Sequence, residues 1–492
     1  MEGTFSHKRY INFPMLFRVI GWLLMIEAGI MLIPTVCGMI YSERNTVHFL
    51  ISMGITVAAG IGLMSLKPTS REMGKREAIL LTAFTWIVLS MFGMLPFILC
   101  KTHLNITDAF FETMSGFTTT GATVLNTYEG VPHSILLWRC VIQWIGGLGI
   151  ILFTIAIVPM LNYQGGMQLF NAEVTGITHD KLRPRIGSTS KDLWLVYTIF
   201  TAAAIILLSL SKMDIFSAIC YGLSTMSTGG FASHDFSLDG WGSIYIKIVI
   251  TFFMFVGSVN FTLVFRGATG QLRSIWKNEV LRIFVVVIFI CYLILTLNVV
   301  INGLATEIED VTIDPLFQAV SLLSSTGLTE EDFFDWGPIA FILLIIMMGM
   351  VGCAGSTSGG AKLDRFVVLY KFLKNEFYRL MNPSSIKTVS MNGKGTPVPV
   401  LQKTLAFLFL YLIVILVGGI ALCIIGLPIT DSFFCSLSAI SNTGVGTDIT
   451  GFNGNYALVP DAAKWVLTFI MLIGRLELFT ILLLLTPHFW KK

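Results

Sequence analysis

Four short polar segments that each contain glycine recur along this chain, and their residue types can bind a dehydrated cation. They are residues 118–121 (TTTG), 227–230 (STGG), 324–327 (SSTG) and 441–444 (SNTG), here called the tips. Glycine adopts backbone angles that other residues avoid, so consecutive carbonyl oxygens can turn to one side. Four copies of one unit predict a pseudosymmetric arrangement around a shared axis.

An aspartate and an apolar stretch precede each tip. The aspartate and the glycine are thirteen residues apart in three copies, namely Asp108 with Gly121, Asp314 with Gly327 and Asp431 with Gly444. In the remaining copy, fifteen residues separate Asp214 from Gly229. The apolar run 108–117 would be a helix of about 15 Å, which is too short to cross a bilayer. We predict four half-membrane helices, each N-capped by aspartate, whose negative C-terminal ends face a common axis.

The composition places these units in a membrane. Hydrophobic residues make up 54% of the 492 residues and charged residues 12%, whereas about 25% of residues in soluble domains are charged. The apolar runs that could each span a bilayer, which needs about 20 residues, are 14–41, 46–66, 77–100, 133–160, 192–211, 243–265, 282–303, 337–370, 401–427 and 463–486. Ten crossings put both termini on one side.

The distribution of charge predicts which side that is. Most lysines and arginines lie in segments 1–18, 67–76, 181–191, 266–282, 362–403 and 491–492. The positive-inside rule makes these segments and both termini cytoplasmic, so the net charge of +3 reflects topology and no nucleic-acid partner is expected. The loop 303–336, on the opposite side of the membrane, is acidic. It is either an ordinary solvated loop or a surface that raises the local concentration of cations. Its acidic residues are Glu307, Glu309, Asp310, Asp314, Glu330, Glu331, Asp332 and Asp335.

The predicted fold is an all-α integral membrane protein with a fourfold repeat of crossing helix, pore helix, filter loop and crossing helix. We assign residues 1–66 to an N-terminal hairpin and 67–165, 166–270, 271–375 and 376–492 to the four repeats. Non-helical backbone at membrane depth must be buried in protein or line a cavity. Carbonyls of four tips around one axis could replace the water shell of a potassium ion.

Two further features lie at membrane depth. The second crossing of repeat 3 is interrupted by a run of small residues, which predicts either an unwound segment or close helix packing. This run contains Gly352, Gly355, Ser356, Thr357, Ser358, Gly359 and Gly360. Arg475 lies midway along the last crossing, where a charge usually faces a cavity or a partner. It could donate to carbonyls of 352–360, or pair with Glu477 or Glu112.

These units together resemble the Trk/Ktr/HKT superfamily of potassium transport proteins over residues 67–492, and the N-terminal hairpin is similar to the TrkH branch. The resemblance implies a potassium filter formed by Thr119, Thr120, Gly121, Thr228, Gly229, Ser325, Thr326, Gly327, Asn442, Thr443 and Gly444. In this family a serine at the first filter glycine accompanies sodium permeability, so Gly121 implies potassium. The resemblance also implies that 352–360 and Arg475 form an intramembrane gate.

The resemblance implies partners as well. Members work as homodimers in the bacterial inner membrane, regulated by a cytosolic ring of TrkA/KtrA-type subunits that bind ATP, ADP or NAD. No cofactor is expected in this chain, and potassium is the transported ligand, held by backbone carbonyls.

Other classes of function account for less of the sequence. A less selective potassium/sodium channel or a cation-coupled symporter of the same fold remains the alternative. A transporter with inverted repeats is disfavoured, because an even number of crossings separates any two tips and all four therefore enter from one face. An intramembrane enzyme is disfavoured because all seven histidines fall at helix ends or in loops.

Overall fold

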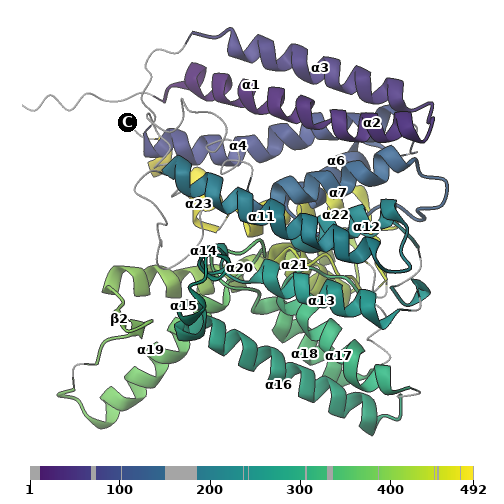
Figure 1. Cartoon of the computed structure of the whole chain (residues 1–492). Coiled ribbons are helices and arrows are strands. Elements are labelled where there is room, and N and C mark those ends of the chain that lie inside the picture. The colour runs from purple at the N-terminus through teal and green to yellow at the C-terminus, as the bar shows by residue number, and fades with distance from the viewer. Residues whose placement is uncertain are drawn as a thin grey trace, which may run out of the picture.

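The computed structural model describes residues 11–67, 74–100, 102, 104–149, 186–235, 238–241, 243–304, 307–329, 336–385, 387–447, 449–451, 454–476 and 478–490. Nearly all regular structure among them is helical, and the long helices run roughly parallel to one another (Figure 1). The predicted all-α fold is therefore confirmed.

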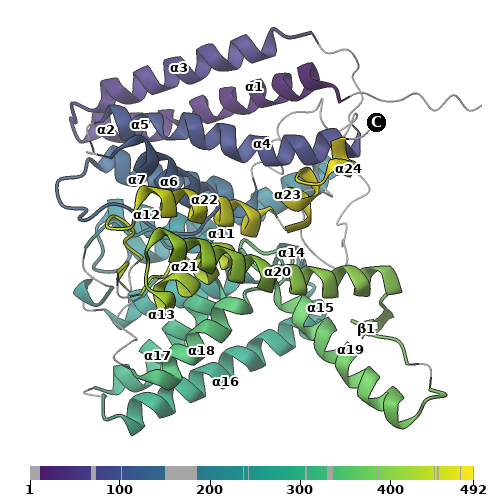
Figure 2. The same ribbon diagram turned by 180° about the vertical axis from the view of Figure 1, so that it is seen from behind.

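An N-terminal hairpin forms one side of the molecule (Figures 1 and 2). It consists of α1 (Phe13–Ile30), which continues into α2 (Leu32–Ile40), and α3 (Thr46–Met64). Helices α1 and α3 pack closely where Gly21 faces Gly60, since a Cβ on Gly21 would lie 2.8 Å from the Gly60 carbonyl oxygen. The hairpin packs on the rest of the chain through α1 against α4 (Lys75–Gly93) and α2 against α7 (His133–Leu148).

Four similar groups of helices follow the hairpin. Each begins with a long helix: α4, which α5 (Leu95–Leu99) extends, α11 (Ile186–Ser209), α16 (Glu279–Ile301) and α20 (Val398–Ile425). A short helix then leads into each tip: α6 (Ile106–Phe117), α12 (Ile215–Met226), α17 (Ile308–Leu323) and α21 (Ile429–Ser441). The second helices are α7, α13 (Ile244–Ser258), α18 (Pro338–Gly349) and α22 (Asp461–Arg475).

The packing between these groups is cyclic. The second helix of each group contacts the short helix of the next, giving the pairs α7–α12, α13–α17, α18–α21 and α22–α6. Because the last group contacts the first, the four short helices surround one axis.

The second helices are less regular than the sequence suggested. Helix α13 turns by 111° into α14 (Phe261–Ala268), and α22 is likewise followed at an angle by α23 (Leu478–Leu484). Helix α18 ends at Gly349, and α19 (Leu363–Met381) begins after a non-helical segment, as predicted for 352–360. Among the described residues, six helices can cross a membrane, or eight if each bent pair counts as one span. The sequence predicted a break in the second crossing of repeat 3 alone, whereas α13 and α22 also bend. The number of crossings stays a prediction.

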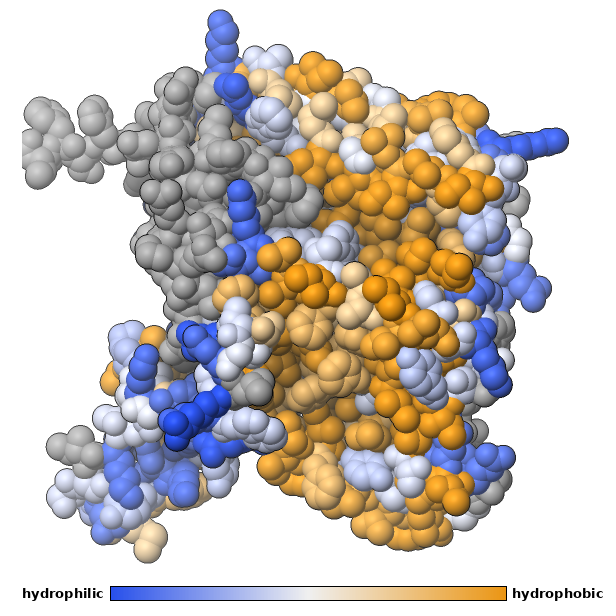
Figure 3. All heavy atoms as spheres, in the orientation of Figure 1, coloured by the Kyte–Doolittle hydropathy of each residue, from blue (hydrophilic) through white to orange (hydrophobic). Residues whose placement is uncertain are grey.

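Small elements complete the described part of the chain. They are η1 (Leu238–Trp241), α15 (Leu272–Lys277), α24 (Pro487–Trp490) and an antiparallel pair, β1 (Ser390–Met391) with β2 (Lys394–Gly395). Helix α19 and the β1–β2 pair project from the helical body (Figure 2). Apolar side chains form a broad band across the face seen in Figure 3, with hydrophilic residues at both ends of the long helices. A bilayer would cover such a band.

Candidate functional site

The four tips share one backbone conformation. Two residues before each glycine, a non-glycine residue adopts a left-handed conformation: Thr119 (φ 54°), Thr228 (φ 52°), Ser325 (φ 61°) and Asn442 (φ 53°). The glycines also have positive φ: Gly121 (85°), Gly230 (80°), Gly327 (73°) and Gly444 (76°). Non-glycine residues with positive φ are uncommon, so four at matched positions indicate a repeated, structurally imposed turn.

This pattern shifts the second tip by one residue. Gly230, and not Gly229, matches the other three glycines, while Gly229 takes the position of Thr120. Counting back thirteen residues from Gly230 gives Ser217, so the second repeat has serine where the others have aspartate. Asp214 is the N-cap of α12 and accepts from the Ser217 N–H at 2.9 Å.

The predicted capping role of aspartate therefore holds for Asp214 alone. Asn105, Glu307 and Pro428 stand at the N-caps of the other three short helices. Asp108 and Asp431 lie inside the first turn, where a negative charge still complements the helix N-terminus.

The tips close into a ring through their glycines. A Cβ built on each glycine would clash with a carbonyl oxygen of the next tip: Gly121 with Gly229 (2.2 Å), Gly230 with Thr326 (2.0 Å), Gly327 with Thr443 (1.9 Å) and Gly444 with Thr120 (2.1 Å). Only glycine fits these positions, because any side chain would displace a backbone oxygen of the neighbouring tip. The ring contains one carbonyl from each repeat, and the last tip contacts the first.

A serine in each short helix holds the ring residue in place. The N–H groups of Thr120, Gly229, Thr326 and Thr443 donate to the carbonyls of Ser115 (2.9 Å), Ser224 (3.0 Å), Ser321 (2.9 Å) and Ser438 (3.0 Å), respectively. All four serines stand six residues before the glycine of the ring. Sequence reasoning missed this serine, although its constant spacing would have given the register of the second tip.

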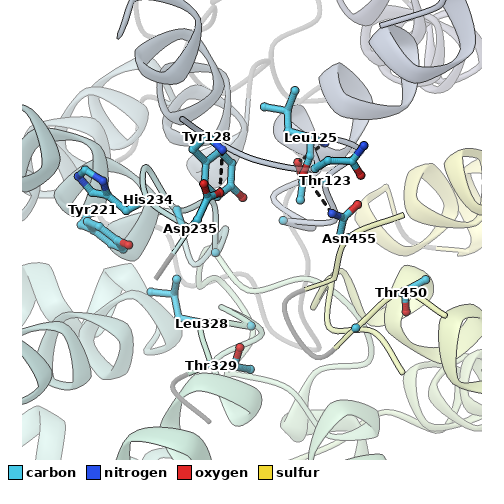
Figure 4. Close-up of a pocket in the computed structure, with 16 residues that line it drawn as sticks. Thr123, Leu125, Tyr128, Tyr221, His234, Asp235, Leu328, Thr329, Thr450 and Asn455 are labelled. Carbon is cyan, nitrogen blue, oxygen red and sulfur yellow. Dashed lines mark hydrogen bonds between the residues drawn. The ribbon is translucent and has the colours of Figure 1, made fainter. Parts of the chain in front are cut away.

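A cavity of about 270 Å³ opens directly above the ring. Gly121, Gly230 and Gly327 form part of its lining, together with Thr123, Asp235 and Asn455 from the segments that leave the tips. Figure 4 shows that these residues come from different repeats. Two hydrogen bonds join the repeats here: Asn455 donates to the Leu125 carbonyl (3.2 Å), and the Tyr128 N–H donates to Asp235 (2.7 Å). Polar and apolar residues both line this vestibule, and among the described lining residues Asp235 carries a carboxylate.

A buried ion pair supports the segment that follows the first tip. Arg139 Nε donates to Glu112 at 2.6 Å, and both side chains are fully buried. Glu112 also accepts from the Val124 N–H at 2.8 Å, while Arg139 donates to the Ala232 carbonyl at 3.1 Å. The pair therefore joins the segments that follow tips 1 and 2. Glu112 is occupied by Arg139, which leaves the suggested Arg475–Glu112 pair without support.

Two other acidic residues also have structural partners. Asp314 is buried and accepts from Lys247 at 2.7 Å, and Glu309 lies 2.9 Å from the same amine. Asp108 accepts from Lys464 at 2.6 Å. These lysines join a second helix to the short helix of the next repeat. Asp314 therefore does not belong to a solvated acidic loop, and residues 330–335 lie outside the described residues.

The non-helical segment 352–360 lies against the side of the ring opposite the vestibule. Its contacts with tip 3 run from the Gly352 N–H to the Leu323 carbonyl (2.8 Å), from Ser358 Oγ to the Ser324 carbonyl (2.6 Å) and from the Gly359 N–H to Ser325 Oγ (3.0 Å).

The same segment reaches the other repeats as well. Thr228 Oγ1 of tip 2 lies 3.2 Å from Thr357 Oγ1. A Cβ on Gly359 would lie 2.5 Å from Asn442 Cβ, and one on Gly360 would lie 2.9 Å from Ser441 Cα. The Gly355 carbonyl accepts from the Phe261 N–H at 3.0 Å, at the point where the chain turns from α13 into α14. Ser356 Oγ is buried without a hydrogen-bond partner among the described residues.

Arg475 completes this layer on the side of the ring opposite the vestibule. Its guanidinium donates to the Thr357 carbonyl (2.7 Å) and Thr119 Oγ1 (3.2 Å), and to the carbonyls of Gly146 and Gly147 (2.5 Å each). One side chain of repeat 4 thus joins the segment of repeat 3 to tip 1 and to the end of α7. Glu477 lies outside the described residues. Lys362, which sequence reasoning did not single out, is a second cation in this layer; it is buried and donates to the Ser358 carbonyl.

Comparisons with known proteins agree with this architecture. The sequence matches the family described as "TrkH: Cation transport protein" over residues 45–492. The Trk system potassium uptake protein TrkH of Escherichia coli K12 is 35% identical, covering 98% of this chain and 100% of that protein. TrkI of Halomonas elongata, also named a Trk system potassium uptake protein, is 32% identical over 97% of each.

A solved structure gives the same result for the fold. The crystal structure of the potassium transporter TrkH from Vibrio parahaemolyticus has a TM-score of 0.87 and 32% identity, covering 97% of this chain and 100% of that one. The apolar band and the membrane-length helices agree with a transporter that spans the membrane. The chain belongs to the TrkH family of cation transport proteins.

Proposed function

We propose that this chain takes up potassium ions across the bacterial inner membrane through the ring of four tips. The closed ring of backbone carbonyls is the observation that carries the proposal, because such oxygens replace the hydration shell of a permeating cation. The printed names of the relatives, which are potassium uptake proteins, favour potassium as the ion.

The proposed path has three stations. Cations enter the vestibule, where Asp235 raises their local concentration. They lose water at the ring, where the C-terminal ends of the short helices add partial negative charge. They then meet segment 352–360 and Arg475, which together act as the gate. In this proposal 67–165, 166–270, 271–375 and 376–492 are the four pore repeats behind the 1–66 hairpin.

Regulation is proposed to come from outside this chain. A TrkA/KtrA-type cytosolic ring that binds ATP, ADP or NAD would act on the cytoplasmic ends of the helices, where both termini also lie, and the chain would work as a homodimer. The basic residues of α15 and α19, such as Arg273, Lys371 and Lys374, offer a surface for such a ring, although the positive-inside rule alone would place them there.

Ion flux into proteoliposomes that contain the purified full chain tests the proposed selectivity. Uptake of potassium and rubidium is expected to exceed uptake of sodium and lithium, with empty liposomes as the control. Equal uptake of sodium and potassium would contradict the selectivity and favour the less selective channel. Uptake of potassium that requires a sodium or proton gradient would favour the symporter.

A further inference from the structure

The second tip lacks a hydroxyl group that the other three possess. In tips 1, 3 and 4 the threonine of the ring pairs with a hydroxyl two residues earlier, namely Thr120 with Thr118 (2.8 Å), Thr326 with Ser324 (2.6 Å) and Thr443 with Ser441 (2.8 Å). Gly229 stands at this position in tip 2. One quadrant of the ring therefore has no side chain of its own to hold it.

The side chain of Gln143 occupies the space that a threonine would fill. It extends from α7 of the first repeat, and a Cβ on Gly229 would lie 2.5 Å from its Cδ, 2.6 Å from its Oε1 and 2.8 Å from its Nε2. Gln143 is fully buried. Glycine at 229 is thus required by the glutamine amide, since Gly229 itself does not have the positive φ of the ring glycines.

The amide of Gln143 binds the backbone of tip 2 on both sides of the ring. Its Nε2 donates to the Gly229 carbonyl at 2.7 Å, and its Oε1 accepts from the Phe231 N–H at 3.2 Å. Ser224, the serine of α12 that holds the ring residue, donates its hydroxyl to the same Oε1 at 3.0 Å. The Gly229 carbonyl is the one that contacts Gly121 in the ring. Gln143 therefore fixes a ring oxygen directly.

This amide belongs to only one of three comparable helices. A glycine in each of these helices packs against the residue that precedes its own tip, which identifies the equivalent positions. A Cβ on Gly146 would lie 1.9 Å from the Phe117 carbonyl oxygen, one on Gly257 would lie 3.1 Å from that of Met226, and one on Gly474 would lie 2.2 Å from that of Ile440. Three residues before these glycines stand Gln143, Met254 and Met471. Methionine cannot donate a hydrogen bond, so α13 and α22 have no equivalent donor at this position.

We propose that Gln143 is a positioning residue that sets the ion preference of the ring. Its hydrogen bond holds the Gly229 carbonyl at the ring radius suited to potassium and prevents this oxygen from moving inward around the smaller sodium ion. The glutamine thus replaces, from the neighbouring repeat, the threonine missing from tip 2. The inference rests on the proposed potassium function and names the residue that maintains selectivity in the second quadrant.

The test compares potassium and sodium fluxes through the full chain in proteoliposomes. Gln143→Met keeps the side-chain volume and removes the amide, as at Met254 and Met471. We expect the ratio of potassium to sodium flux to fall about tenfold, which corresponds to one lost hydrogen bond to the ring. The double variant Gln143→Met with Gly229→Thr combines a methionine on the neighbouring helix with a threonine in the tip, which is the combination that tips 1 and 3 already have. It should recover most of the wild-type ratio of potassium to sodium flux.

Two further variants keep the result interpretable. Gly229→Ala displaces the amide from the opposite side and should lower the ratio even if Gln143→Met cannot be purified as a folded protein. Gln318→Ala removes the same kind of buried side chain from α17, where its Nε2 has no hydrogen-bond partner among the described residues, and should leave the ratio unchanged. A selective wild type whose Gln143→Met and Gly229→Ala variants both keep its ratio overturns this inference alone. A wild type that passes sodium as readily as potassium overturns the proposed selectivity, and the inference with it.

Discussion

Replacement of Arg475 by alanine is expected to raise potassium flux through the purified protein. The guanidinium lies beside the ring, where it donates to Thr119 Oγ1 and to the Thr357 carbonyl. A fixed charge about 6 Å from a passing ion, at an effective dielectric constant of about 20, repels it by roughly 2.8 kcal/mol. Removing this barrier corresponds to at most about a 100-fold increase in flux. The measurement is the initial rate of rubidium uptake into proteoliposomes.

A second substitution separates the charge from the hydrogen bonds. Arg475→Lys keeps the positive charge but cannot reproduce the branched hydrogen bonding of the guanidinium, so its flux should rise much less than that of the alanine variant. Arg379→Ala removes an exposed arginine of α19 and should have no effect. Unchanged or reduced flux in Arg475→Ala, at a matched amount of reconstituted protein, would rule out the barrier. Equal increases in the alanine and lysine variants would assign the gate to the bonds instead of the charge.

The second large effect is expected at Gly121. A serine there would need to keep φ near 85°, which L-residues rarely adopt, and its Cβ would lie 2.2 Å from the Gly229 carbonyl oxygen. The clash must move a ring oxygen, so Gly121→Ser should reduce the preference for potassium over sodium by about tenfold or more, a loss of ~1.4 kcal/mol or greater. The ratio of potassium to sodium flux in proteoliposomes measures it.

The chain offers a matched control for this change. Gly130 has a similar φ of 78°, but a Cβ there would meet no atom within 4 Å. Gly130→Ser therefore introduces the same backbone strain without touching the ring, and the flux ratio should stay at the wild-type value. If Gly121→Ser also kept that value, the ring of carbonyls would not be the site where the ions are distinguished.

Much of the architecture was predictable from the sequence because its signals are local. Apolar length indicated the long helices, and the run of small residues at 352–360 indicated the break between α18 and α19. The bends after α13 and α22 were missed, since Ser258 and Arg475 stand in stretches that remain apolar on average. A bend behind a tip depends on contacts with other repeats, which no local pattern reveals.

The residue types of the site were predictable from the sequence, but the register of the second tip and the side chains that hold the ring were not. The Asp-to-Gly spacing worked for three tips and misplaced the second, because Asp214 caps α12 while Ser217 takes the matching position. The serine six residues before each ring glycine was the better marker. Gln143 and Arg139 could not be assigned from sequence, since each acts on a tip about ninety residues away along the chain.

The most direct test of the central claim is a crystal structure of the full chain grown with rubidium and an equal concentration of sodium. Anomalous scattering then locates rubidium independently of sodium and water. The ring is expected to show a rubidium peak on its axis, among the carbonyl oxygens of Thr120, Gly229, Thr326 and Thr443. A ring without rubidium while the ion binds elsewhere along the path would contradict the claim that these four carbonyls select the ion.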